Sequence, residues 1–224
     1  EMSASLVGSE MCIRDSYKGL HKNVITDLFG GQYYVDSYNR KSVLAENSVN
    51  GGVTSWVNQK LGVGDVIRRD YDGFVMYEGG FAQLEYNKDK VSAFVSGGLT
   101  NTSYWRKDRF YYSGDKQLSS KKHYLGGNVK AGLNYNLDDY NNVFFNTGFI
   151  SRAPIFDNTF INSQSSHERN PDAKNEKVYS FELGYGYRSQ YFSANVNAYY
   201  TMWKDKALYL SLIHISEPTR LALI

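Results

Sequence analysis

The sequence contains a single cysteine, Cys12, and only three prolines among 224 residues. One cysteine cannot form an intrachain disulfide or a thiolate cluster around a metal. No stretch approaches the roughly 18 apolar residues that suggest a membrane-spanning helix. The net charge is only +2, without a basic run, which gives little support to nucleic-acid binding. What remains is a chain unusually rich in aromatic residues, with 20 tyrosines and 12 phenylalanines.

Both ends of the chain are expected to be foreign to the protein. One DNA strand can encode Leu6–Ser16, and its reverse complement then encodes Leu210–Arg220. Segments of a natural protein have no reason to be opposite strands of one DNA element, and this element resembles a transposase-delivered sequencing adapter. We therefore predict that residues 1–16 and 210–224 are adapter-derived and take no part in the fold. Residues 17–209 are expected to be an incomplete domain. Without the two basic and four acidic residues of the tails, the net charge is +4.

Apolar and polar residues alternate over several segments of the chain. The clearest examples are Leu125–Tyr135, Tyr179–Tyr187 and Phe192–Met202. Successive residues of a strand point to opposite faces, so each segment would form a strand with one apolar and one polar face. The helical period of 3.6 residues would scatter the same apolar positions around an axis. Several segments reach the roughly 9–11 residues that cross a bilayer at a tilt of about 45°.

Short polar turns alternate with long connections between these segments. The turns are Asn87–Lys90, Leu137–Asn141 and Arg188–Gln190, and the long stretches are His21–Gly79, Arg106–Lys122 and Ser151–Lys177. Outer-membrane barrels combine short periplasmic turns with long extracellular loops in this way. A soluble sandwich also has alternating faces, but it seldom makes every second connection longer than about 15 residues.

We therefore predict an all-β fold, a fragment of a transmembrane antiparallel up-and-down β-barrel. It would be an open curved sheet of about six or more strands with long extracellular loops. Strands are expected near Gly80–Tyr86, Lys90–Thr102, His123–Asn136, Asn142–Ile150, Lys177–Arg188 and Tyr191–Leu208.

The alternation also predicts which side chains meet lipid. The convex face would carry Val129, Ala131, Leu133, Phe181, Leu183, Val196 and Ala198. The lumen would be lined by Asn128, Lys130, Glu182, Asn195 and Asn197. A one-residue slip in register would turn all of these side chains over and place charges in hydrocarbon.

Three motifs occur in an order that resembles the TonB-dependent receptors. Asn146–Pro154 is similar to the family's strand ending in "GF-x-R-A-P", and Asn170–Lys177 resembles its "NP-x-LKPE" segment. Glu182–Tyr185 then matches its "ELG-x" strand. Ala173 and Asn175 depart from the usual Leu and Pro of the second motif. The sequence of this part of the chain is most similar to that of receptors from Bacteroidetes-type bacteria.

The resemblance implies a barrel of about 22 strands, closed by an amino-terminal plug, in the bacterial outer membrane. It implies uptake of a scarce nutrient energised by the inner-membrane TonB complex, with a ferric siderophore or other iron complex as the expected ligand. Cobalamin or a glycan would be an alternative. The expected partners are outer-membrane lipid, the TonB complex through a plug outside this segment, and a ligand at the extracellular loops. No enzymatic activity and no cofactor are expected. A passive porin or structural barrel, or a soluble all-β binding module, remains as another interpretation.

No residue is predicted to be catalytic or to bind a metal, and no cofactor-binding residue can be identified. His21, His123 and His167 are widely separated and form no ligand-spaced pair, which favours exposed loop positions. Arg152 could meet an anionic ligand. A structural role at the exit of a strand is the favoured interpretation, since Pro154 ends the ladder there.

Other polar and aromatic segments have a structural interpretation beside a functional one. Arg68–Asp72 and Asp138–Asp139 could hold an ion, but solvated turns are favoured. Gly62–Gly64 lacks the strand and helix that surround a phosphate-binding loop. Aromatic residues of the long connections could stack on a ligand, or they could pack within loops and interface girdles: Trp56, Tyr104, Trp105, Tyr111 and Tyr112.

Overall fold

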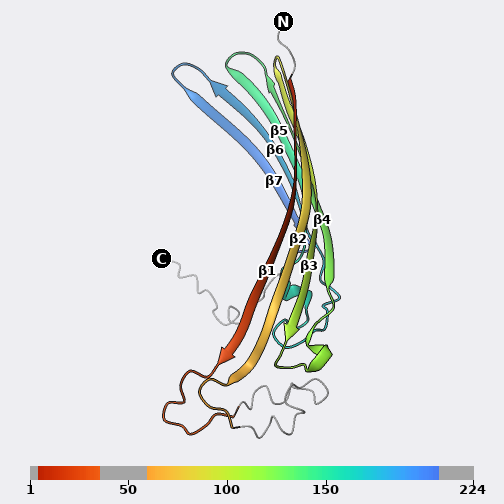
Figure 1. The fold of residues 1–224 in the computed structure, drawn as a ribbon. Helices are drawn as coiled ribbons and strands as arrows, with labels where there is room; N and C mark the ends of the chain where they lie inside the picture. The colour runs from red at the N-terminus through yellow and green to blue at the C-terminus, as the bar shows by residue number, and fades with distance from the viewer. Residues whose placement is uncertain (1–4, 36–59, 207–224) are drawn as a thin grey trace, which may run out of the picture.

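The computed structural model describes residues 5–35 and 60–206. Within these residues, seven strands form one antiparallel sheet in which each strand pairs with the next in sequence (Figure 1). The strands are β1 (Ser5–Val24), β2 (Val66–Lys88), β3 (Val91–Asp108), β4 (Lys122–Asn136), β5 (Asn141–Arg152), β6 (Glu176–Arg188) and β7 (Ser193–Lys204). The predicted all-β fold and the up-and-down order of at least six strands are confirmed. No helix in the described part of the chain is long and apolar enough to span a membrane.

The sheet is open and curved, with one concave and one convex face (Figure 1). Tight turns join the strands at one end, and the long connections lie at the other. Two short 3-10 helices lie in the long connections, η2 (Gly114–Gln117) and η3 (Phe156–Thr159). β2 has 23 residues, about twice the roughly 9–11 needed to cross a bilayer. The sheet therefore extends well beyond a membrane at the end with the long loops.

The helix η3 shows which side chains lie on the concave face. Figure 1 places η3 on the concave side, and a Cβ atom built on Gly73 would lie 3.1 Å from the Phe156 ring in η3. Gly73 of β2 is directly opposite Arg106 of β3. Every second residue of β3 from Arg106 back to Ser96 lies on the same face, and Ser96 is directly opposite Lys130 of β4. Because directly paired residues share a face and successive residues alternate, Lys130 is concave and its neighbours are convex.

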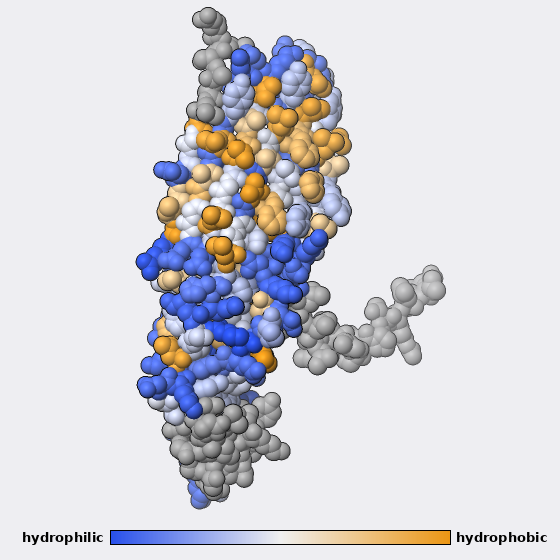
Figure 2. All heavy atoms as spheres, turned by 90° about the vertical axis from the view of Figure 1, so that its right-hand side faces the viewer, coloured by the Kyte–Doolittle hydropathy of each residue, from blue (hydrophilic) through white to orange (hydrophobic). Residues whose placement is uncertain are grey.

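Register carries this assignment across the sheet and confirms the predicted facing. The convex rows contain Val129, Phe149 and Tyr179 in one line, and Leu133, Phe145, Leu183 and Ala198 in another. Apolar side chains on this face are uncovered, with Leu183 61% and Val196 70% exposed. Figure 2 shows that apolar residues cover the half of the convex face nearest the tight turns, and polar residues cover the other half.

The concave face is polar and contains glycines where aromatic rings lie flat on the sheet. Any Cβ atom at Gly132 or Gly184 would collide with the ring of Phe94 or Phe144, respectively. Glu182 accepts hydrogen bonds from the side-chain amides of two flanking asparagines, Asn146 (3.0 Å) and Asn197 (3.1 Å). Charge on this face is therefore paired with polar neighbours, as expected of a lumen wall.

Two expectations for the first part of the chain are wrong. His21–Gly79 is not irregular throughout, since β1 continues to Val24 and β2 already begins at Val66. The amino-terminal tail does enter the sheet, because Ser5–Ser16 pairs with Met76–Asn87 of β2. An exposed edge strand offers backbone donors and acceptors to any extended segment, whatever its side chains. The carboxyl-terminal tail lies outside the described residues.

Candidate functional site

The loop end of the concave face holds the largest fully buried side chains that the structure describes. Arg106 and Asp108 of β3 have no exposed surface, whereas most of the sheet is open to solvent. Tyr71 of β2 is directly opposite Asp108, and Tyr104 lies two residues before Arg106 on the same face. We call the group of Tyr71, Tyr104, Arg106, Asp108, Phe156 and Phe160 the loop-end cluster. It is covered by the connection between β5 and β6.

The Arg106–Asp108 ion pair forms the centre of the loop-end cluster. Arg106 Nη2 lies 2.5 Å from Asp108 Oδ2, and Asp108 Oδ1 accepts hydrogen bonds from the backbone amides of Phe110 and Tyr111, each 2.8 Å. Burial raises the pKa of the Asp108 carboxyl and lowers the pKa of the Arg106 guanidinium. The three hydrogen bonds to Asp108 oppose the effect of burial, and the guanidinium stays protonated because its ordinary pKa is so high.

Arg106 also binds the loop that covers it. Its Nη1 donates to the carbonyl oxygen of Ser166 at 2.5 Å and to that of Asn162 at 3.5 Å. The guanidinium lies 4.5 Å from the Tyr71 ring centroid and 5.8 Å from that of Phe160, where cation–π attraction adds to the hydrogen bonds. The buried guanidinium of Arg106 therefore joins β2, β3 and the β5–β6 connection.

His167 joins the two long connections to each other. Its ring stacks on Tyr112 with centroids 3.9 Å apart, and its Nε2 lies 3.1 Å from the carbonyl oxygens of both Lys116 and Gln117. Carbonyl oxygens only accept, so Nε2 carries a proton in this arrangement. Burial, and secondly the charge of Arg106, lower the pKa of His167 to about 4. The ring is therefore neutral at physiological pH.

Further contacts hold the β5–β6 connection near both of its ends. The Tyr104 hydroxyl donates to the Pro154 carbonyl at 2.8 Å, and the Tyr104 and Phe156 rings meet edge to face. Arg169 donates to the Ser120 carbonyl and lies 4.4 Å from the Phe160 ring centroid. The β3–β4 and β5–β6 connections thus form one packed unit at the loop end of the concave face.

The convex side of the loop end carries a second charged cluster. Arg109 bridges Asp70 and Asp72 of β2, with Nη2 at 2.7 Å and 2.8 Å from their carboxylate oxygens. Lys18 of β1 lies 3.2 Å from Asp72. These bonds, that of Arg109 first, lower the pKa of Asp72. The expectation that Arg68–Asp72 is a solvated turn is therefore wrong, since these residues belong to β2 and its aspartates are paired.

The predicted candidate residues are not brought together into one site. His21 stacks on Tyr71 and His123 Nδ1 bonds the Ser103 hydroxyl at 2.8 Å. No group of metal-ligating side chains forms among the residues that the structure describes. Arg152 pairs with Glu176, its Nε 2.6 Å from Oε2. Asp138 accepts the backbone amides of its own turn.

The aromatic residues of the long connections have different positions. Tyr104 and Tyr111 are buried at the loop end, whereas Trp105 stacks on Phe74, and both rings lie on the convex face. Trp56 lies outside the described residues. Gly62–Gly64 forms a turn in which the Gly62 amide donates to Asp65 Oδ2 at 2.7 Å.

Sequence reasoning missed Arg106 and Asp108, the most buried members of the cluster. The strand predicted from the sequence ends at Thr102, whereas β3 continues to Asp108. One face of this segment carries Tyr104, Arg106 and Asp108, and the other carries Trp105 and Lys107. This alternation could have extended the predicted strand. The sequence gives no sign, however, that a charged pair on the lumen face is buried.

An up-and-down sheet with an apolar convex band, a polar concave face and loops packed over one end is the wall of an outer-membrane β-barrel. Comparison with protein families agrees. The model of the family described as TonB dependent receptor-like, β-barrel, matches residues 13–217. The chain belongs to this family, whose members are receptors and transporters of the bacterial outer membrane. The match includes residues 13–16 and 210–217 of the two tails. No curated protein matches the sequence.

Proposed function

We propose that this chain is part of a receptor that takes up a ferric siderophore or other iron complex with energy from the TonB complex. The observation that carries the proposal is the packed unit of the two long connections over the loop end of the concave face. In a barrel this end is the outer mouth, where a ligand first meets the protein. A passive pore has less need of loops ordered by a buried ion pair.

The chemistry of the mouth supports an anionic ligand. Cations lie over aromatic rings at this end, with Arg169 4.4 Å from the Phe160 centroid and Lys122 Nζ 5.8 Å from the Tyr124 centroid. Phe160 and Tyr124 are themselves buried, so it is the cations beside them that would attract the negative charge of a ligand. Cobalamin and glycans would gain less from these cations.

Uptake by the full-length receptor in a bacterium lacking its own iron receptors would test the proposal. Radiolabelled ferric siderophores, cobalamin and an oligosaccharide would be supplied to cells with and without TonB. We expect saturable uptake of an iron complex that disappears without TonB. Uptake that does not saturate and needs no TonB would identify a passive porin, and TonB-dependent uptake of cobalamin or oligosaccharide alone would refute the proposed ligand.

A matched pair of variants would test the role of the mouth. Arg169→Gln removes a cation beside Phe160, and we expect it to weaken ligand binding about fivefold, equivalent to about 1 kcal/mol. Lys88→Gln makes the same change in charge at the end of β2 nearest the tight turns, and it should leave binding unchanged. Equal effects of the two substitutions would contradict a specific role for the mouth.

A further inference from the structure

Two lysines face each other on the convex surface at the outer limit of the apolar rows. Lys177 of β6 is directly opposite Lys204 of β7. Lys177 is also opposite Ser151, which pairs with Gly127, two residues before the convex Val129. Both lysines therefore lie on the face that meets lipid. They are the only charged residues on the convex face of the described strands β5, β6 and β7.

This pairing is unfavourable unless an anion is close. Like charges directly opposite each other destabilise a sheet. Asp205 offers partial compensation, with Oδ2 3.7 Å from Lys177 Nζ, but both side chains are more than 40% exposed, so this ion pair is weak. Lys206 does not add to this charge, because its Nζ lies 5.1 Å from the centroid of Trp203, which is on the opposite, concave face. Two lysines against one aspartate leave an excess of positive charge on the convex face.

The position of the two lysines matches the level of lipid headgroups. Tyr179, two residues inward from Lys177, has its ring 5.7 Å from Lys204 Nζ. From Tyr179 the convex row continues through Phe181, Leu183 and Tyr185 toward the tight turn. Aromatic girdles mark the interfaces of outer-membrane barrels, and lysines beyond them extend into the headgroup region. The long loops place this end of the strands at the outer leaflet.

We propose that Lys177 and Lys204 bind a phosphate group on the headgroup of an outer-leaflet lipid. The phosphate would lie between the two ammonium groups, and the acyl chains would follow the apolar rows of β5, β6 and β7. Charge complementarity and continuity with the apolar band favour this occupant over a soluble anion. The inference rests on the membrane orientation and is independent of the nutrient that the receptor transports.

The test compares binding of phosphorylated and dephosphorylated lipid A to the purified full-length receptor by native mass spectrometry. A lysine near an anionic membrane surface contributes a factor of about five in affinity, so Lys177→Gln with Lys204→Gln should weaken binding of the phosphorylated lipid about 25-fold. The Lys177→Arg, Lys204→Arg variant should retain it. Lys130→Gln removes a strand lysine from the concave face and should change the affinity less than twofold.

Several outcomes would overturn the proposal. They are unchanged binding by the double glutamine variant, equal binding of the dephosphorylated lipid, an equal loss in Lys130→Gln, and displacement of the lipid by millimolar inorganic phosphate. Each variant's folding is checked by its mobility shift on heating in detergent. If the double variant does not fold, the single variants Lys177→Gln and Lys204→Gln decide, each with an expected loss of about fivefold. Uptake measurements do not enter this test, so its failure is distinguishable from failure of the proposed transport.

Discussion

Arginine placed at the centre of the convex band gives the sharpest test of the membrane assignment. Ala131 of β4 lies between Val95 of β3 and Thr147 of β5, midway along the apolar rows. Ala131→Arg removes only a methyl group, so the lost apolar contact is small and the added charge dominates the effect. An arginine at the bilayer midplane of such barrels costs about 2–4 kcal/mol. The equilibrium constant for folding into the bilayer should therefore fall by about 30- to 1,000-fold.

The matched control is Asn128→Arg on the same strand. Asn128 is concave and lines an open hollow of about 260 Å³ together with Lys130, so an added cation there has room and polar neighbours. Urea titrations of full-length receptor folding into phospholipid vesicles would give both free energies. We expect Asn128→Arg to cost about 0.5 kcal/mol or less, the usual range for a surface substitution away from packed or strained positions. Equal costs, or a larger cost at Asn128, would refute the facing and with it the membrane assignment.

Two further predictions concern the loops in the full-length receptor. Arg106→Met leaves Asp108 as an unpaired buried charge, which should destabilise the packed loops by about 3–5 kcal/mol. Adding Asp108→Asn removes the charge but keeps an acceptor for the backbone amides of Phe110 and Tyr111, so it should restore much of the loss. The expected result is faster amide exchange over residues 154–170 in the single variant than in the double one. The pKa of His167, about 4, is below its ordinary value, so loop stability should be full above pH 6.5 and should fall as the pH drops toward 4. Protease cleavage of the β5–β6 connection should increase in the wild type as the pH falls from 7.5 to 5. His167→Asn should abolish this increase. A variant with the same pH dependence as the wild type would contradict the role of His167.

The sheet could be predicted from the sequence because lipid and lumen impose opposite demands on alternate residues. Lys130 and Val129 can exchange faces only at a cost of several kcal/mol, so the pattern in β4 determines its register. The same reasoning located the tight turns that follow β2, β4 and β6. It failed where neither face meets lipid. In Val66–Gly79, beyond the apolar band, paired charges such as Asp72 with Arg109 replace the alternation, and the strand resembled a loop.

The loop-end cluster could not be predicted because its burial depends on residues distant in sequence. Arg106 is buried by the carbonyl oxygens of Asn162 and Ser166, and these positions depend on how the β5–β6 connection folds back over the sheet. A single sequence shows that Arg106 and Asp108 are charged, but it does not show which segment of the chain buries them. His167, expected to be exposed, is held in the same way by the carbonyls of Lys116 and Gln117.

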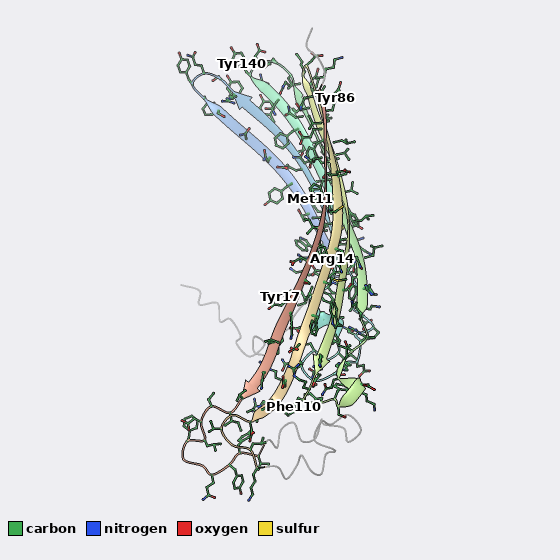
Figure 3. The ribbon with its side chains drawn as sticks, viewed as in Figure 1. Met11, Arg14, Tyr17, Tyr86, Phe110 and Tyr140 are labelled. Atoms are coloured by element: carbon green, nitrogen blue, oxygen red, sulfur yellow. The ribbon has the colours of Figure 1, made fainter. Side chains whose placement is uncertain are left out.

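The facing of Glu10–Ile13 bears on the predicted foreign origin of the amino-terminal tail, which pairs with β2. Glu10 is opposite Ala82, and Arg14 is opposite Glu78, so both charges lie on the convex face; Met11 and Ile13 lie on the concave face. Figure 3 shows Arg14 directed toward the convex side and Tyr17 toward the concave side. From Glu10 to Ile13 the apolar and polar positions are therefore reversed relative to β2–β7, whereas Arg14 is paired with Glu78, 3.4 Å away.

This reversal leads to a prediction about the parent gene. A one-residue shift would correct the facing, but β1 keeps one register with β2 from Ser5 through Lys22, so the tail inherits the register of the residues after it. Backbone pairing alone is enough to extend an edge strand, and the side chains of the tail then fall on the wrong faces. We therefore expect the assembled genomic sequence to differ before Tyr17, with apolar residues opposite Ala82 and Leu84. Genomic sequence that continues unchanged through Glu10 and Arg14 would refute the adapter origin and would show that the natural barrel exposes a carboxylate to lipid.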